Sequence, residues 1–309
     1  MTKMCTYLKL LLLIAFMLGG VVLNAQEAKM VRAQTLYNEK KPDQAKLCID
    51  SVVIHPETKG RFEAWTLRGY IYFEIYKRTD KIKFKSPLRD TIVASIKRSN
   101  KLKPDADYLS NNKKLLINIS GHYYKLEGMY LQDSSNYEMS LKSFEKFKEL
   151  TRLADSTANL KDKDMEFYLA AGSHFSQEFN LNKKNIKAFE IAKVALMTAL
   201  EISPNDTSAN MNMGLMYLNQ STDLIERVDG GEVSISELDV LLENSIKLAK
   251  QAEQFILKVY NQNNKSRKAV LALYYVYRVL NEPEKKALFE SKCKEMKIEV
   301  TDESSKQKK

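Results

Sequence analysis

The chain has 309 residues, only 10 glycines and 6 prolines, and a formal net charge of +10. A chain in which Lys, Glu, Leu and Ala abound while Gly and Pro are few favours helices. The positive charge is modest and scattered along the chain. It is consistent with weak attraction to anionic surfaces and gives no ground for nucleic-acid binding.

The first 25 residues have the layout of an export signal. Lys3 and Lys9 give a positive start, an apolar run follows from Leu10 to Leu18, and a short tail ends at Ala25. Because the apolar run is shorter than the ~20 residues of a membrane-spanning helix, a signal peptide cleaved after Ala25 is favoured over an uncleaved anchor. We therefore expect an exported protein, in the periplasm or on the surface of a Gram-negative bacterium.

The cysteines predict neither a lipid anchor nor a disulfide framework. Cys5 precedes the apolar run, so it is not the lipid-bearing cysteine that follows such a run in bacterial lipoproteins. Cys48 and Cys293 fall near opposite ends of the sequence, each on an apolar helix face. Free thiols are therefore expected at both positions.

The first predicted helix pair lies between Ala28 and Pro56. Ala33 and Ala45 stand twelve residues apart on apolar faces, and the segment KPDQAKLCIDSVVIHP carries apolar residues at helical spacing before Pro56 ends it. The first pair lacks a glycine, and Ala33 takes its place as the small residue.

Four later segments share one spacing: a large residue, a glycine four residues on, and an aromatic residue three after the glycine. A small residue on a packed face lets a partner helix approach closely, which offsets the roughly 1 kcal/mol that glycine costs in a helix. We therefore expect each glycine to be a contact point with a neighbouring helix. The four sets are Trp65, Gly69 and Tyr72; Ile117, Gly121 and Tyr124; Tyr168, Gly172 and Phe175; and Asn210, Gly214 and Tyr217, where Asn210 departs from the pattern.

Most of these helices are followed by a second amphipathic helix. The clearest is YEMSLKSFEKFKEL (residues 137–150), where Ser140 is the small residue and Phe144 and Phe147 are the large ones. Another runs from about Lys184 to Ile202, with apolar residues at i, i+3 and i+4 spacing. One long helix is predicted from about Ser236 to Tyr260, and a closing pair covers about 266–280 and 283–296. The polar tail, residues 299–309, is predicted to be disordered.

These segments resemble the tetratricopeptide repeat family, whose signature is W-x2-L-G-x2-Y, then A-x3-F, then P. The resemblance implies an all-α, right-handed α-solenoid of about five to six antiparallel helix pairs over residues 26–298. The glycines are 52, 51 and 42 residues apart (69 to 121, 121 to 172, 172 to 214), against a family repeat of about 34. We therefore expect an irregular array with enlarged loops or longer helices.

In this family, ligands lie mainly along a concave face that the first helix of each pair forms. The family's carboxylate clamp is absent, because Thr66 with Tyr70, and Asn118 with His122, stand where Lys and Asn are required. The resulting mixed polar and aromatic face suits an extended peptide. Through the glycine register, the resemblance predicts a partner face of Glu63, Thr66, Tyr70, Glu74, Asn118, His122, Lys125, Glu166, Ser173, Gln177, Met211, Leu215 and Asn219.

A basic segment between residues 77 and 89 allows two interpretations. It is either a solvated insertion or a loop that contacts an anionic surface, such as lipid head groups or an acidic partner. The solvated insertion is favoured. The basic residues are Lys77, Arg78, Lys81, Lys83, Lys85 and Arg89.

No constellation for catalysis or metal binding stands out. His55, His122 and His174 share no metal-ligand spacing with each other or with cysteines and carboxylates. We expect no enzyme activity and no cofactor. The leading hypothesis is an exported scaffold or adaptor that binds a protein or peptide partner in the cell envelope. The alternative is a structural envelope component that contacts lipid or glycan through the basic segment.

Overall fold

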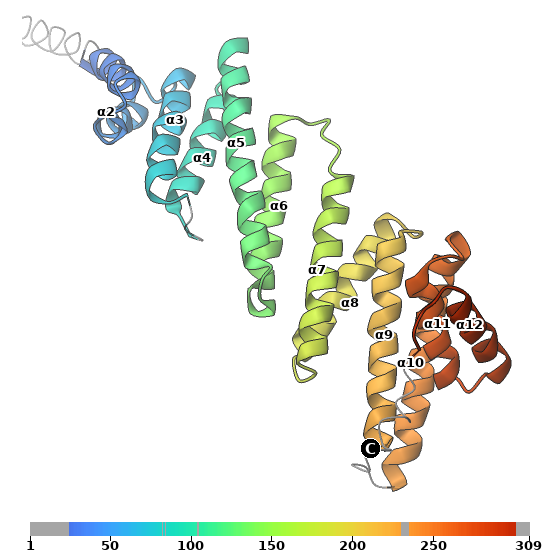
Figure 1. The fold of residues 1–309 in the computed structure, drawn as a ribbon. Helices are drawn as coiled ribbons and strands as arrows, with labels where there is room; N and C mark the ends of the chain where they lie inside the picture. Colours follow the sequence, from blue (N-terminus) through green and yellow to red (C-terminus); the bar gives the residue numbers. More distant parts are fainter. Residues whose placement is uncertain (1–24, 82, 84, 104, 230–234, 301–309) are drawn as a thin grey trace, which may run out of the picture. The chain divides into compact units, whose positions relative to one another are not determined.

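The computed structural model describes residues 25–81, 83, 85–103, 105–229 and 235–300, and all regular structure in these ranges is helical (Figure 1). A first helix covers residues 25–38. The others are α2 (Pro42–Ile54), α3 (Phe62–Thr79), α4 (Pro87–Lys101), α5 (Ala106–Tyr130), the 3-10 turn η1 (Ser134–Asn136), α6 (Tyr137–Ala154), α7 (Lys161–Leu181), α8 (Ile186–Ile202), α9 (Thr207–Asp229), α10 (Ile235–Gln262), α11 (Arg267–Val279) and α12 (Pro283–Glu295). The predicted signal peptide, up to residue 24, and nearly all of the predicted tail lie outside the described residues.

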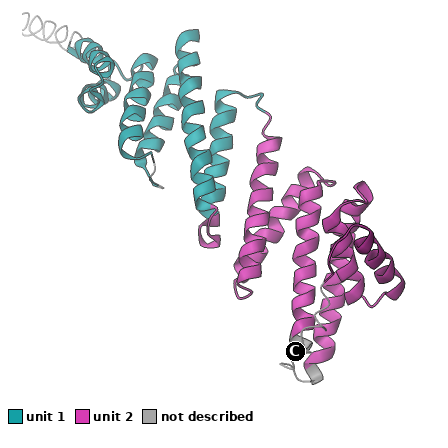
Figure 2. Cartoon of the chain, in the orientation of Figure 1, with its two compact units in different colours: residues 1–130, 138–158 teal, residues 131–137, 159–309 magenta. Residues whose placement is uncertain are grey.

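The chain divides into two compact units (Figure 2). Unit 1 comprises residues 1–130 and 138–158, and unit 2 comprises residues 131–137 and 159–309. No feature of the sequence indicated this division. The extent of the repeat domain, residues 26–298, and the right-handed sense of its superhelix stay predictions.

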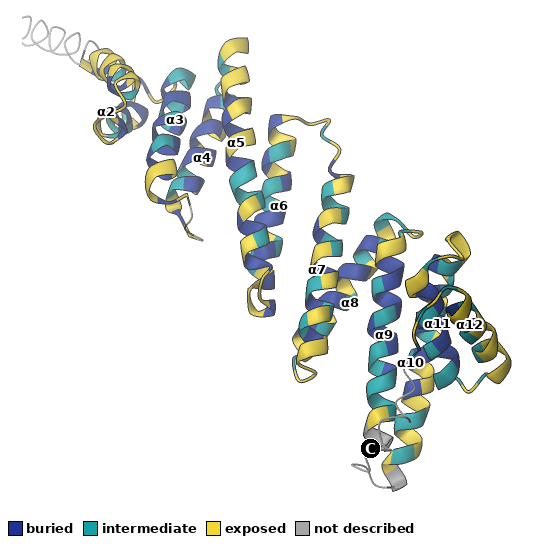
Figure 3. Cartoon of the chain, in the orientation of Figure 1, coloured by how far each residue is buried: buried dark blue, intermediate teal, exposed yellow. Residues whose placement is uncertain are grey.

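In unit 1, consecutive helices pack as antiparallel pairs around apolar stripes (Figure 3). The helix over 25–38 packs on α2 through Ala33 and Ala45, both fully buried, as the apolar spacing predicted. α3 and α4 form the next pair, and their core continues into α5 and α6 through side chains such as Leu116 and Leu150. Because each helix buries only one stripe, the array leaves its outer faces exposed to solvent.

In unit 2, α7 packs on α8, α9 on α10 and α11 on α12. The helix predicted over 184–202 and the long helix predicted over 236–260 are confirmed as α8 and α10. Tyr274 and Tyr277 of α11 are only 1% and 3% exposed and belong to the core.

Three of the four glycines are contact points between paired helices. A Cβ at Gly69 would stand 2.8 Å from Ile96 of α4, and one at Gly172 would stand 2.5 Å from Leu196 of α8. At Gly214 it would meet Ile256 of α10 even more closely. The prediction for Gly121 is wrong, because no described atom of a neighbouring helix lies within 4 Å of the equivalent position.

The long spacing between glycines is taken up mainly by long helices. α5 has 25 residues and α7 has 21, well above the average of about 11–12 for an α-helix. None of the described helices combines the length and the hydropathy that a membrane span requires.

Candidate functional site

A groove of about 590 Å³ lies on unit 1, across the first helices of three consecutive pairs. We call it the unit 1 groove. Its lining includes Glu27, Met30 and Gln34 from the first helix, Glu63, Thr66 and Tyr70 from α3, and Tyr108 and Asn111 from α5. The structure therefore brings three of the four partner-face residues predicted on α3 into one groove.

The charges in the unit 1 groove compensate one another. The Arg61 guanidinium, at the start of α3, forms an ion pair with Glu27 and lies 3.7 Å from the Glu63 carboxylate. One cation thus stands between two acids from different helices. Because surface ion pairs of this kind contribute little to stability, their main consequence is a groove with a small net charge.

Tyrosines form much of the groove surface and hold it in place. The Tyr70 hydroxyl donates to the backbone carbonyl of Asn111 at 2.8 Å, which ties α3 to α5. Its ring meets Tyr37 edge-on at 6.5 Å, and Tyr108 meets Phe62 in the same way at 5.3 Å. Burial raises the pKa of Tyr37, Tyr70 and Tyr108, so these hydroxyls stay protonated at neutral pH and can donate hydrogen bonds.

Thr66 lies at the floor of the groove and is only 4% exposed. Its hydroxyl is 2.8 Å from both Ser99 Oγ of α4 and Asn112 Oδ1 of α5. The Asn112 amide also donates to Ser99 Oγ, at 3.1 Å. A satisfied buried network of this kind fixes the relative positions of three helices, so Thr66 supports the groove from below.

A second cavity, of about 370 Å³, continues this face and shares Tyr37 with the unit 1 groove. It is lined by Glu74, the fourth partner-face residue predicted on α3, and by Lys40, Lys77 and Arg78. Lys77 pairs with Glu74 at 2.8 Å, and Arg78 pairs with Asp43 at 2.6 Å. The second cavity therefore carries more cations than acids, unlike the unit 1 groove.

The residues predicted on α5 lie elsewhere. Asn118 and Lys125 are exposed, and neither they nor His122 lines the unit 1 groove. Instead the groove meets α5 at Tyr108 and Asn111. The cause is the position of α5 along its own axis relative to α3. Leu115 of α5, and not Gly121, lies opposite Gly69 of α3. The glycine register therefore placed the α5 residues about two turns too far along the helix.

His122 packs against α3. Its ring lies edge-on to Tyr76 at 5.2 Å and to Phe73 at 5.9 Å. Burial, and after it the positive charge of Lys125 and other nearby cations, holds the pKa of His122 below its ordinary value. A half-buried neutral imidazole between two aromatic rings fits a packing role.

The remaining predicted partner-face residues belong to unit 2. Glu166 pairs with Lys163 at 2.6 Å, and Ser173 and Gln177 are exposed on α7. Met211 is 8% exposed, while Leu215 and Asn219 are half-buried on α9. Met211 is thus largely covered by its own unit, because its side chain joins the buried stripe of α9.

The basic segment is not one loop. Lys77 and Arg78 form the last turn of α3, and Arg89 lies within α4 and is only 4% exposed. The expectation of six basic residues on a loop is therefore wrong for these three. Only Lys81, Lys83 and Lys85 are exposed on the connection between the helices.

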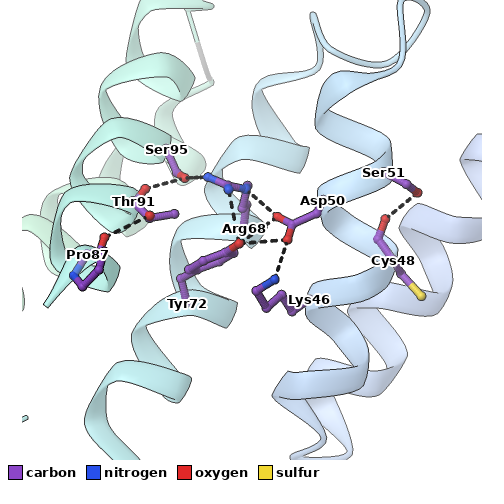
Figure 4. Close-up of polar contacts among 9 residues, drawn as sticks. All are labelled: Lys46, Cys48, Asp50, Ser51, Arg68, Tyr72, Pro87, Thr91 and Ser95. Carbon is purple, nitrogen blue, oxygen red and sulfur yellow. Dashed lines mark hydrogen bonds and ion pairs between the residues drawn. The ribbon is translucent and has the colours of Figure 1, made fainter. Parts of the chain in front are cut away.

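A half-buried polar cluster, which the sequence did not reveal, joins α2, α3 and α4 (Figure 4). The Arg68 guanidinium donates to Asp50 at 2.8 Å and to Ser95 at 2.9 Å, and Tyr72 and Lys46 donate to the same carboxylate. Burial works to raise the pKa of Asp50, but these hydrogen bonds outweigh it and leave that pKa below its usual value. The cluster holds helices together and lines neither of the two cavities described above.

A signal for part of the groove was present in the sequence. Ala33 occupies the position of Gly69 in the first pair. The offsets that lead from Gly69 to Glu63, Thr66 and Tyr70 lead from Ala33 to Glu27, Met30 and Gln34, all of which line the groove. Tyr108 and Asn111 carried no such signal, because the level of α5 depends on its packing.

Within the described residues, no group of three or more His, Cys, Asp or Glu side chains is arranged to hold a metal ion. Cys48 is half-buried and Cys293 is buried, and both are free thiols, as expected.

Comparisons with known proteins identify no family for this chain. No family model matches the chain, and no curated protein matches it. Among solved structures, it is similar to PilW, described as a widely conserved type IV pilus biogenesis factor. The identity is 15%, with 87% of this chain and 92% of that chain covered and a TM-score of 0.27. At this level of similarity we draw no argument from PilW.

Proposed function

We propose that this chain is an exported scaffold that binds an extended peptide segment of a protein partner in the unit 1 groove. The observation that carries the proposal is a groove lined by three successive first helices, next to a second cavity whose lining also includes Tyr37. Two neighbouring cavities suit an extended chain better than one compact small molecule.

The chemistry of the groove supports a peptide. Its tyrosines offer flat apolar rings with a hydroxyl at the tip, a combination enriched in protein-binding surfaces. Gln34 and Thr35 add side chains that can hydrogen-bond to a peptide backbone, and Val31, 64% exposed, adds an apolar contact. In the second cavity, Lys40, Lys77 and Arg78 outnumber Glu74, so the acidic end of the peptide is expected there.

The resemblance to tetratricopeptide repeats, with its concave ligand face, agrees with this reading. The predicted export signal supports a partner in the periplasm or on the cell surface. The alternative function, a structural contact with lipid or glycan through the basic segment, is weakened. Only Lys81, Lys83 and Lys85 remain on the connecting loop, and Lys83 is paired with Asp80 at 2.6 Å.

The test is a binding measurement with two matched variants. Peptides are selected on the purified chain from a displayed random library, and their affinities are measured by fluorescence polarisation. Val31→Glu places a charge in the groove, whereas Ile54→Glu places the same charge at an exposed apolar position of α2, 76% exposed and outside the groove. We expect Val31→Glu to weaken binding about tenfold or more and Ile54→Glu to change it less than about twofold.

Two outcomes would overturn the proposal. One is a library that yields no binding peptide. The other is an equal loss of affinity in both variants, which would place the peptide away from the groove.

A further inference from the structure

A different cavity, of about 490 Å³, lies in unit 1 between the beginning of α4, the second half of α5, and α6. We call it the cationic cavity. It is lined by Lys85, Arg89, Lys142 and Lys146 and by a single carboxylate, Asp90. Cations therefore outnumber acids among the side chains that line this cavity. Such an excess in a confined space raises the local concentration of anions.

Arg89 is the most constrained of these cations. It is 4% exposed, its guanidinium donates to the backbone carbonyl of Lys83 at 2.9 Å, and the guanidinium carbon lies 5.7 Å and 5.5 Å from the ring centroids of Tyr76 and Tyr123. An arginine held between rings keeps its orientation without a ligand. This reduces the conformational entropy that binding an anion would cost.

The loop beside the cavity is also held in place. The Asp80 carboxylate at the end of α3 accepts hydrogen bonds from Ser86 Oγ and Lys83 Nζ, both at 2.6 Å. This leaves Lys85, two residues further on, as the loop lysine that lines the cavity. The lysines of the basic segment therefore have different positions. Lys83 anchors the loop, whereas Lys85 lines the cavity together with Arg89.

Helix α4 begins at this cavity. Ser86 caps the helix by accepting a hydrogen bond from the Leu88 amide, and Ser86 and Pro87 both line the cavity. The positive end of the α4 dipole thus adds to the charge of the side chains. Two lysines of α6, Lys142 and Lys146, supply charge from the other side, although Lys146 is shared with Glu149 at 2.8 Å.

We propose that the cationic cavity binds the phosphate group of a small ligand. Its volume lies in the range of about 300–1,000 Å³ that is typical of small-molecule sites. The donors are those that proteins use for phosphate: an oriented guanidinium, mobile ammonium groups and a helix N-terminus. The phosphate can come from a soluble phosphate ester or from a lipid head group, and this site is independent of the unit 1 groove.

The experiment compares two double variants of the full chain that lose the same charge. Lys85→Gln/Lys142→Gln removes two cavity cations. Lys113→Gln/Lys114→Gln removes two exposed cations of α5 that do not line the cavity. Titration calorimetry at low salt with inorganic phosphate and with glycerol phosphate is expected to show binding to the unmodified chain. The cavity variant should bind about tenfold more weakly, and the α5 variant should stay within about twofold.

Vesicles distinguish the two sources of phosphate. If the ligand is a lipid head group, vesicles containing phosphatidylglycerol will sediment with the chain, vesicles of phosphatidylcholine alone will not, and the cavity variant will lose the effect. If the ligand is soluble, glycerol phosphate will bind and the vesicles will not. The proposal is overturned if none of the three phosphate probes binds, or if both double variants lose binding equally, which would indicate diffuse charge attraction.

Discussion

Helices α9 and α5 both carry a glycine three residues before an aromatic residue, yet the two glycines have different surroundings. Gly214 of α9 faces α10, where a Cβ would collide with Ile256 and approach the Ala252 carbonyl to 3.4 Å. Gly121 of α5 has no described atom of a neighbouring helix within 4 Å of that position. The same local pattern therefore marks a helix contact in one pair and not in the other.

In the α5–α6 pair the close approach is made by another small residue. Ser140 of α6 is fully buried, and its hydroxyl donates to the backbone carbonyl of Glu127 at 2.9 Å. Beside it, the rings of Tyr124 and Phe147 lie 4.9 Å apart. The comparison teaches that the spacing predicts a helix and its buried stripe, whereas the partner helix decides which small residue takes the contact.

The largest effect is expected at Ser140, the small residue in the apolar spacing of α6. Ser140→Leu adds three carbons where α6 touches the α5 backbone and removes the hydroxyl, so it should lower the free energy of unfolding by about 3 kcal/mol. Urea denaturation followed by circular dichroism measures the change. An unfolding midpoint equal to that of the unmodified chain would show that α5 and α6 do not meet at Ser140.

A smaller loss is expected for Gly214→Ala, of about 1–3 kcal/mol. The new methyl group would collide with an inner atom of Ile256, which cannot move aside as freely as the end of a side chain. The same denaturation measurement applies. Ile256→Ala removes that atom, so Gly214→Ala should cost less stability in a chain that already carries Ile256→Ala. An alanine variant as stable as the unmodified chain would contradict close packing between α9 and α10.

The opposite sign is expected for Gly121→Ala. No described atom of a neighbouring helix lies near the new methyl group. The substitution should therefore raise stability by the higher helix propensity of alanine, up to about 1 kcal/mol. Gly69→Ala serves as the comparison, because there the methyl group would press on Ile96 Cδ1. A destabilised Gly121→Ala chain would show that α5 has a close neighbour at this level.

The smallest effect concerns pH. Because the pKa of His122 is lower in the folded chain than its ordinary 6.5, the unfolded chain binds more protons just below pH 6.5. The contribution of His122 to stability is therefore complete above pH 6.5 and falls as the pH drops toward its folded pKa. The stability of His122→Gln, measured by thermal unfolding between pH 7 and pH 5, should depend less on pH. An unchanged dependence would mean that His122 is not the group responsible.

Much of the fold could be predicted because the apolar spacing of an amphipathic helix can be read from a short stretch of sequence. The i, i+3, i+4 stripe located α8 and α10 to within two residues at each end. The level at which one helix meets the next could not be predicted, because it depends on pairs of side chains far apart in sequence, such as Gly69 with Leu115.

The candidate site shows the same contrast between residues placed by one helix and residues placed by packing between helices. Glu63, Thr66 and Tyr70 were found because they stand at fixed offsets from Gly69, within one helix. Tyr108 and Asn111 were missed because they reach the groove through the packing of α5 on α3. The cationic cavity was missed as a cavity because Lys85, Lys142 and Lys146 are brought together only when α6 folds back on α5.

The measurement that tests the central claim most directly is site-specific photo-crosslinking with a selected peptide. A photoreactive residue is placed at Val31 or Asn111 in the unit 1 groove, and at Leu47 or Ile54 on α2, outside the groove. The account predicts crosslinks to the peptide from the two groove positions and not from the two α2 positions. Crosslinks of equal yield at all four positions, or only from α2, would contradict it.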